Sequence, residues 1–290
     1  MTSHRDYQAG EIISISLPFI HVVTDNLKGK ICDYCFVECK NNELGKCSRC
    51  KKMFYCGKEC QQKDWIRHKF ECKFFRKKYE PLTHAYLQIE WIDEFFRLVL
   101  RLYLYITENP ESIYEQYKLL NDENSSICLN DIRNWNCPVI YPKRIMNVEK
   151  FSNLLKIFQI EHNIDILYKC FAIGAENFFK IYDYRMKEIG SGLYLAESKF
   201  QHCCQPNTKL LYNGIQLVMR SIKSIRNGEQ IFINNIRYCD INGQIFWSPT
   251  DKHYYFTYKC GLCMNLERFN EIDSEQSFKN LRLEILRLKN

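Results

Sequence analysis

Residues 32–72 read CDYCFVECKNNELGKCSRCKKMFYCGKECQQKDWIRHKFEC, and this stretch decides the fold around it. It carries eight ligand-type side chains in four pairs, with the spacing C-x2-C-x11-C-x2-C-x5-C-x3-C-x7-H-x3-C. Zinc accepts thiolate and imidazole, and a site closed by four protein ligands is structural and not catalytic. The spacing therefore predicts two structural zinc ions, with the ligands Cys32, Cys35, Cys47, Cys50, Cys56, Cys60, His68 and Cys72.

The chain holds 16 cysteines, which in a secreted protein would indicate disulfides. The first residues, MTSHRDYQAGE, lack the apolar core of a signal peptide. In a reducing compartment metal ligation is the better interpretation, although single cysteines can also act as small buried hydrophobes. The most apolar stretch, residues 91–106, is interrupted by charged side chains and does not read as a membrane span. We expect a soluble monomer of the nucleus and cytoplasm, without membrane contact.

The last ligand pair indicates a helix. His68 and Cys72 are four residues apart, which places both on one helical face, and we expect this helix to begin near Gly57 and to run through Trp65. Tyr55, Trp65 and the final H-x3-C of the run YCGKECQQKDWIRHKFEC resemble the MYND finger family. A RING-type cross-brace is the nearest alternative, but it carries its histidine in the second pair and not in the fourth.

The MYND resemblance implies interleaved pairs. One zinc would be held by Cys32, Cys35, Cys56 and Cys60, and the other by Cys47, Cys50, His68 and Cys72. Cys39 would be a spectator. Related MYND modules bind proline-containing peptides, so the resemblance implies partner peptides.

Residues 46–78 are strongly basic, with twelve Lys or Arg against three Asp or Glu, an excess larger than the +7 of the whole chain. Such a flank can contact phosphates, which makes DNA an alternative partner. No base-reading motif accompanies it, so a solvated charged face is the plain interpretation.

The rest of the chain divides into regions with strand-like and regions with helix-like sequence patterns. Residues 11–23 read as one or two strands, residues 84–187 as mainly helical with a polar loop at 121–131, and residues from 190 onward as short strands. Asn213-Gly214 predicts a hairpin turn between two of these strands, and Asn227-Gly228 another turn.

This order of parts resembles the SMYD family of protein-lysine methyltransferases, whose SET domain is split by a MYND finger. The specific elements are the finger, HCCQPN at 202–207, the Gly228-Glu229 turn and Cys260-x2-Cys263. The resemblance implies an α+β fold: a split SET-domain β-fold with an inserted MYND zinc finger, a helical insert and a cysteine-containing post-SET segment. The expected boundaries are 1–30 for the first SET strands, 31–74 for the finger, 75–188 for the helical insert, 189–248 for the core SET, 249–266 for post-SET and 267–290 for a terminal helix.

The family transfers a methyl group from S-adenosylmethionine to a lysine amine of a histone or another protein. The resemblance implies cofactor contacts from Asn177, Gln201, His202 and Phe256, and a catalytic phenol on Tyr254. For the two aromatic residues, a place in the core is the alternative. Asn207 matches the end of a motif that threads the strands into a knot-like site.

Four features depart from the family pattern. The glycine-rich turn that wraps the cofactor is expected before Ala9 and is missing. Gln201 stands where the family has asparagine, and Asn235 where it has tyrosine. Tyr258 replaces a post-SET ligand, which leaves Cys204, Cys260 and Cys263 for a third zinc, with Cys203 or Cys239 as substitutes.

These departures leave two functions open. The first is a protein-lysine methyltransferase with impaired activity. The second is a catalytically inactive MYND adaptor that binds protein partners and, through its basic flank, DNA.

Overall fold

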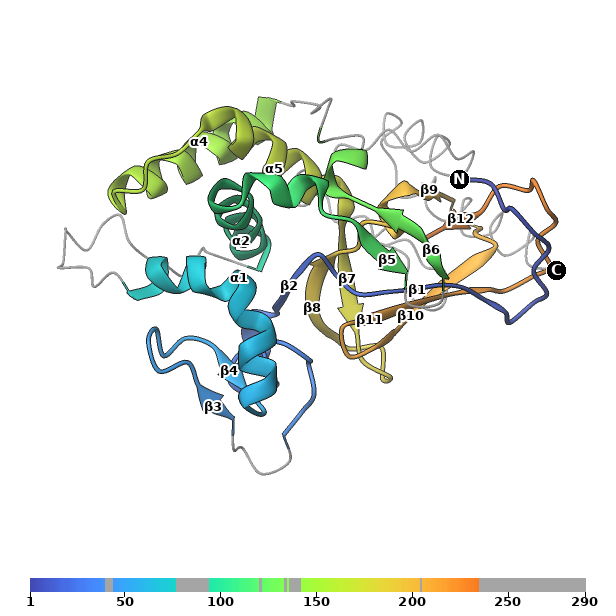
Figure 1. The fold of residues 1–290 in the computed structure, drawn as a ribbon, viewed down its shortest axis with the longest axis horizontal. Helices are drawn as coiled ribbons and strands as arrows, with labels where there is room; N and C mark the ends of the chain where they lie inside the picture. The colour runs from blue at the N-terminus through green and yellow to red at the C-terminus, as the bar shows by residue number, and fades with distance from the viewer. Residues whose placement is uncertain are drawn as a thin grey trace, which may run out of the picture.

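The structure is a computed structural model that describes residues 1–39, 44–76, 94–119, 122–132, 135, 142–203 and 205–234. It mixes helices and strands, as expected for the α+β class (Figure 1). The finger projects at the lower left of this view. The helices α2 (Glu94–Glu108), α4 (Pro142–Ile157) and α5 (Ile164–Asn177) lie above it, and most strands lie to its right.

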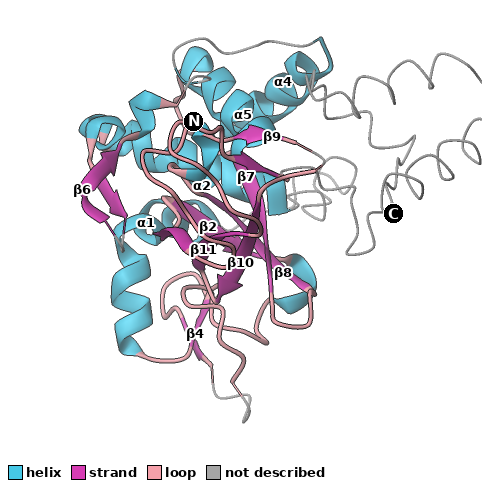
Figure 2. Ribbon diagram, turned by 90° about the vertical axis from the view of Figure 1, so that its right-hand side faces the viewer, coloured by secondary structure: helices cyan, strands magenta, loops and turns pink. Residues whose placement is uncertain are grey.

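Two three-stranded antiparallel sheets form the β part. In one, β1 (Ile12–Ser16) pairs with β11 (Gln216–Ser221), which pairs with β10 (Thr208–Asn213). In the other, β2 (Ile20–Val23) pairs with β8 (Glu188–Leu193), which pairs with β7 (Phe178–Tyr182). Each sheet thus joins a strand from before the finger to strands from after the helices, so that the finger and helices are insertions between paired strands (Figure 1). In Figure 2 these strands lie below the helices α4 and α5.

The strands predicted for residues 11–23 are confirmed as β1 and β2. All four residues of β2 are buried, as expected for a mainly apolar strand inside a fold. The hairpin at Asn213-Gly214 is confirmed between β10 and β11, where Gly214 adopts a φ of 58°. The turn at Asn227-Gly228 is confirmed as well, with Gly228 at a φ of 81°.

Three two-stranded sheets complete the β structure of the described residues. β3 (Gly45–Lys46) pairs with β4 (Phe54–Tyr55) inside the finger, and β9 (Gln201–His202) pairs in parallel with β12 (Phe232–Ile233). β5 (Tyr117–Leu119) pairs with β6 (Asp122–Ile127). The polar loop expected at 121–131 is therefore wrong over β6. Pairing with β5 organises a sequence whose polar composition alone indicates a loop.

The long helices are α1 (Lys58–Arg76), α2 (Glu94–Glu108), α4 (Pro142–Ile157) and α5 (Ile164–Asn177). α1 confirms the predicted helix that carries His68 and Cys72. The helical prediction for 84–187 is wrong at β5, which pairs with the neighbouring β6, and at β7, whose aromatic and branched residues pair with β8. Short 3-10 turns occur at Asp25–Leu27, Pro110–Tyr114, Leu129–Asp131 and Glu197–Lys199.

The main core joins the helices to β2 and β8. Leu98 and Leu102 of α2, Phe151 of α4 and Leu167 of α5 are all fully buried, which confirms the apolar stripes as core-facing. Phe74 at the end of α1 stacks on Phe158 with ring centroids 3.9 Å apart, so the finger helix is packed into the same core. None of the described helices is long and apolar enough to cross a membrane.

Candidate metal centres and methyl-transfer site

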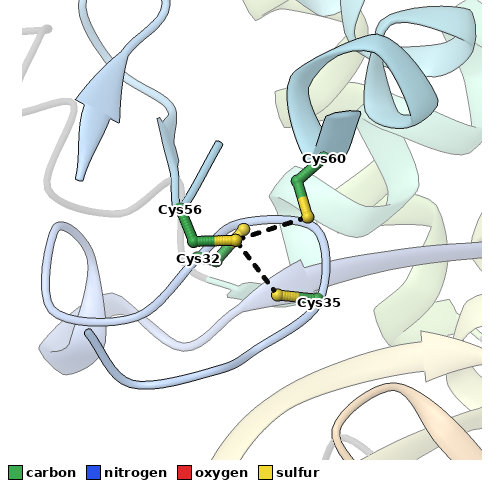
Figure 3. A group of neighbouring side chains, drawn as sticks. All are labelled: Cys32, Cys35, Cys56 and Cys60. Atoms are coloured by element: carbon green, nitrogen blue, oxygen red, sulfur yellow. Dashed lines mark hydrogen bonds between the residues drawn. The ribbon is translucent and has the colours of Figure 1, made fainter. Parts of the chain in front are cut away.

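The first metal centre joins a loop to the start of α1. Cys32 and Cys35 come from the loop after β2, Cys56 follows β4, and Cys60 lies in the first turn of α1 (Figure 3). The four Sγ atoms all lie within 4.8 Å of one another, with Cys35 at 3.7 Å and Cys60 at 3.4 Å from Cys56. Cys56 is exposed, so this centre is open to solvent on one side.

The second metal centre is fully buried. Cys47 and Cys50 precede β4, and His68 and Cys72 lie one turn apart on α1. The His68 Nε2 atom lies 3.4 Å from Cys47 Sγ and 3.5 Å from Cys50 Sγ, and Cys47 Sγ lies 3.9 Å from Cys72 Sγ. The Nε2 nitrogen therefore faces the three sulfur atoms.

Both centres fit zinc by their donors and spacing. A tetrahedral ion with Zn–S bonds of about 2.3 Å separates its sulfur ligands by about 3.8 Å. The distances between sulfur atoms, 3.4 to 3.9 Å, agree with this value. The structure thus assembles the two interleaved sets that the MYND resemblance implies, one of four cysteines and one of three cysteines with a histidine.

The loop that carries Cys32 and Cys35, which we call the first zinc knuckle, packs against the SET strands. Phe36 adopts a φ of 63° just after Cys35, and its ring contacts the ring of His21 on β2 at 5.3 Å between centroids. On the other side, a Cβ atom on Gly214 would lie 2.5 Å from the Cys35 carbonyl oxygen. The β10–β11 hairpin therefore approaches the knuckle closely enough to require glycine at its turn.

The basic flank is partly engaged within the fold. Lys63 Nζ lies 2.6 Å from Glu59 Oε1, and Arg67 donates a hydrogen bond to the Tyr117 hydroxyl at 2.8 Å. The Arg67 guanidinium also lies 5.2 Å from the centre of the Tyr105 ring. Binding of DNA by this flank remains a prediction.

Two of the expected cofactor residues have amides engaged in hydrogen bonds within the protein. Asn177 ends α5, is 6% exposed, and donates from Nδ2 to the Ile173 carbonyl oxygen at 3.3 Å. Gln201 is exposed on β9, and its Oε1 accepts a hydrogen bond from Gln230 Nε2 at 2.7 Å.

His202, beside Gln201 on β9, is half-buried. Its burial lowers the pKa of the imidazole to about 4, so His202 is neutral at physiological pH. The β9–β12 pairing places it opposite Ile233.

Asn207 has a clear role in threading the strands. Its Nδ2 donates to the Gln230 carbonyl oxygen at 2.8 Å, and its Oδ1 accepts from the Phe232 backbone N–H at 2.8 Å. Its own carbonyl oxygen accepts from the Ile222 N–H at 2.9 Å. One buried side chain thus holds the start of β10 against the segment that leads into β12.

A cavity of about 290 Å³ lies beside the segment that leads into β9. Its lining combines the basic or titratable side chains of His4, Arg5 and Lys199 with apolar ones that include Ile127 and Phe200. Phe200 directly precedes Gln201, whereas the side chains of Asn177, Gln201 and His202 are not part of the lining.

Several buried ionisable residues were not expected from the sequence, among them Glu197, Arg97 and Arg101. Glu197 is fully buried between Ser14 and Ser16, and no local pattern indicates it. Arg97 and Arg101 are fully buried as well. Their spacing of four within an apolar helical stripe was the available signal, because it puts both charges on one helical face.

Several expected site residues lie outside the described residues. They are the catalytic Tyr254, the adenine-stacking Phe256, Asn235, Tyr258, and the third zinc set of Cys204, Cys260 and Cys263. Their roles stay predictions. Cys203, the substitute ligand, is described, and its Sγ donates to the Gln205 carbonyl oxygen at 3.4 Å.

Comparisons with known proteins agree with this arrangement. The MYND finger family matches residues 32–72. Human N-lysine methyltransferase SMYD2 is 27% identical over 273 residues, which cover 91% of this chain and 57% of the relative. Histone-lysine N-methyltransferase ASHR1 of Arabidopsis thaliana is 24% identical over 96% of this chain and 55% of its own length, and human histone-lysine N-methyltransferase SMYD3 is 28% identical over 77% and 49%.

The fold and the two metal centres define the class: an α+β SET fold split by an inserted MYND finger. The MYND finger and the similarity to SMYD2, SMYD3 and ASHR1, at 24–28% identity over most of the chain, support membership of the SMYD family. It spans little more than half the length of SMYD2 and ASHR1.

Proposed function

We propose that this protein transfers a methyl group from S-adenosylmethionine to lysine side chains of proteins, histones among them. The observation that carries the proposal is the Asn207 connection, which holds β10 against the β12 segment beside His202. It lies in the motif on which the resemblance to the SET site rests. The relatives that align over most of the chain are named as lysine methyltransferases.

The charge state of His202 supports a sulfonium cofactor. A neutral imidazole adds no positive charge beside a cationic ligand, whereas an imidazolium would repel it. Because burial holds the pKa of His202 near 4, this condition is met across the physiological range. In the proposed reaction the neutral lysine amine attacks the methyl carbon, and the pair of electrons in the S–CH3 bond returns to sulfur. Tyr254 is the proposed group that orients the amine.

A second function is favoured by one specific observation. The amides of Gln201 and Asn177 are both engaged by protein partners, Gln230 and the Ile173 carbonyl. A cofactor would have to compete for them, at the cost of these hydrogen bonds. With both metal centres assembled, the alternative is a MYND adaptor on a SET scaffold that binds protein partners without methyl transfer.

Calorimetric titration of the zinc-loaded full chain with S-adenosylmethionine distinguishes the two functions. Micromolar binding by the unmodified protein, with methyl transfer to histones, is the expected result for an enzyme. The variants Gln201→Asn and Asn235→Tyr restore the family residues and should tighten binding, while Gln116→Asn at an exposed position should change nothing. If none of these proteins binds, the methyltransferase proposal fails and the adaptor stands.

A further inference from the structure

Helix α2 carries two buried arginines into the finger. Arg97 and Arg101 are spaced by one helical turn and are 2% and 1% exposed. α2 lies outside the finger sequence, which ends at Cys72. Buried guanidinium groups require partners of opposite charge, because an unpaired buried charge is strongly unfavourable.

Arg101 connects α2 to the finger and to the SET strands. Its Nη2 pairs with the Asp64 carboxylate on α1, and Asp64 Oδ2 accepts a hydrogen bond from the Tyr55 hydroxyl at 2.7 Å. Its Nη1 donates to the His21 carbonyl oxygen of β2 at 2.7 Å. One side chain therefore ties three parts of the molecule together.

Arg97 reaches the first zinc knuckle. Its Nη2 donates to Asp33 Oδ1 at 3.3 Å, and Asp33 lies between the ligands Cys32 and Cys35. The other oxygen, Oδ2, accepts from the Phe54 backbone N–H at 2.8 Å. The knuckle and β4 are thus held to each other and to α2 through one carboxylate.

Both arginines also face Glu71, which is fully buried. Glu71 Oε1 lies 3.7 Å from Arg97 Nη2 and 3.7 Å from Arg101 Nε. The same oxygen accepts a hydrogen bond from His68 Nδ1 at 3.0 Å. With the proton on Nδ1, the lone pair of Nε2 is directed at Cys47 and Cys50, where a zinc ion would be bound.

We propose that Arg97 and Arg101 of α2 are positioning residues for the buried zinc site, acting through Glu71 on the orientation and basicity of His68. Carboxylates that accept the second ring N–H of a zinc-bound histidine tune the affinity for the metal. Here the position of that carboxylate is set by two guanidinium groups from outside the finger, each 3.7 Å from Glu71 Oε1. Zinc retention by the finger consequently depends on the docking of α2.

Zinc release from the full chain tests the proposal. Mixed with excess chromophoric chelator, the zinc-loaded protein should release metal in a fast phase from the open four-cysteine site and a slow phase from the buried site that contains His68. Cobalt(II) substitution assigns the phases, since the visible bands of cobalt depend on the number of thiolate ligands. Glu71→Gln and Arg101→Met should each accelerate the slow phase about 10- to 100-fold and leave the fast phase unchanged, because neither side chain contacts the loop that carries Cys32 and Cys35.

The control variant is Arg226→Met, the same chemical change at an exposed position, which should alter neither phase. If Arg101→Met fails to fold, Glu71→Gln decides alone, because glutamine keeps the size of glutamate and an oxygen for His68. The proposal also requires the cobalt bands of the buried site to shift in Glu71→Gln. An unchanged slow phase in that variant, or equal acceleration of both phases, overturns the proposal.

Discussion

Glu197 accepts a hydrogen bond from Ser16 Oγ at 2.7 Å, in an interior where the carboxyl group is fully buried. Ser14 Oγ lies 2.8 Å from the other carboxylate oxygen. Burial raises the pKa of Glu197, and the hydrogen bonds from the two serines only partly oppose this rise. The folded state thus favours the protonated carboxyl more than the unfolded chain does.

The variant Glu197→Gln should therefore stabilise the protein at neutral pH. A raised pKa in the folded state contributes stability below the unfolded pKa, and this contribution is lost as the pH rises through the folded pKa. Glutamine does not ionise and so avoids this loss of stability. We therefore expect the free energy of unfolding to rise by roughly 1–3 kcal/mol at pH 7 to 8. Urea unfolding at a series of pH values should show the gain shrinking toward pH 4. A gain that does not depend on pH would contradict this account.

A second prediction concerns Gly190 on β8, at the contact between the SET sheet and the finger. A Cβ atom there would lie 2.3 Å from the Val22 carbonyl oxygen and 2.5 Å from the Phe36 ring. Because strand pairing holds the Val22 carbonyl in place, Gly190→Ala should cost about 1–3 kcal/mol of unfolding free energy. Gly57→Ala is the matched control, since a Cβ atom on Gly57 meets nothing within 4 Å. Equal unfolding free energies for the two variants would refute the prediction.

A third prediction isolates the Asn207 connection. Asn207→Asp keeps an acceptor for the Phe232 N–H but loses the donor to the Gln230 carbonyl and introduces a charge at a buried position. We expect destabilisation of about 1–3 kcal/mol and weaker protection of the amides of β12 from hydrogen exchange. Asn213→Asp makes the same change at an exposed residue and serves as the control. Normal protection of β12 in Asn207→Asp would count against the threading role.

The two metal centres should respond differently to loss of one ligand. Cys56→Ser opens the solvent-exposed centre, so elemental analysis should find one zinc fewer while α2 stays docked. Cys72→Ser empties the buried centre, and because binding and docking are linked reciprocally, amide exchange in α2 should become faster. The unmodified protein should hold at least two zinc ions. Slow exchange of α2 after loss of the buried zinc would show that the two are not coupled.

The finger was predictable from the sequence because all its ligands lie within one short segment of the chain. The spacing from Cys32 to Cys72 determines which donors can meet, and the interval between His68 and Cys72 indicates the helix. The hairpin at Gly214 was predictable because its signal also lies within a short segment. β6 was not, since its polar residues form a strand only by pairing with β5.

The burial of ionisable side chains could not be predicted from the sequence. Glu197 reads as an ordinary surface residue, and only the approach of Ser14 and Ser16 from the distant strand β1 explains its place. Gln201 was expected to lie beside the cofactor, at a position where the family has the shorter asparagine. Its hydrogen bond to Gln230 depends on the pairing of β9 with β12, and no local sequence pattern predicts that pairing.

The pairing of β1 with β11 has a consequence for the order in which the protein assembles. Ile12 meets Arg220 only after almost all of the described chain has left the ribosome, whereas every zinc ligand of the finger has emerged by Cys72. Contacts between residues far apart in the chain form late, because closing a long loop is entropically costly. The finger and α2 can therefore assemble around the metal first, and then serve as the preformed surface on which the two parts of the sheet meet.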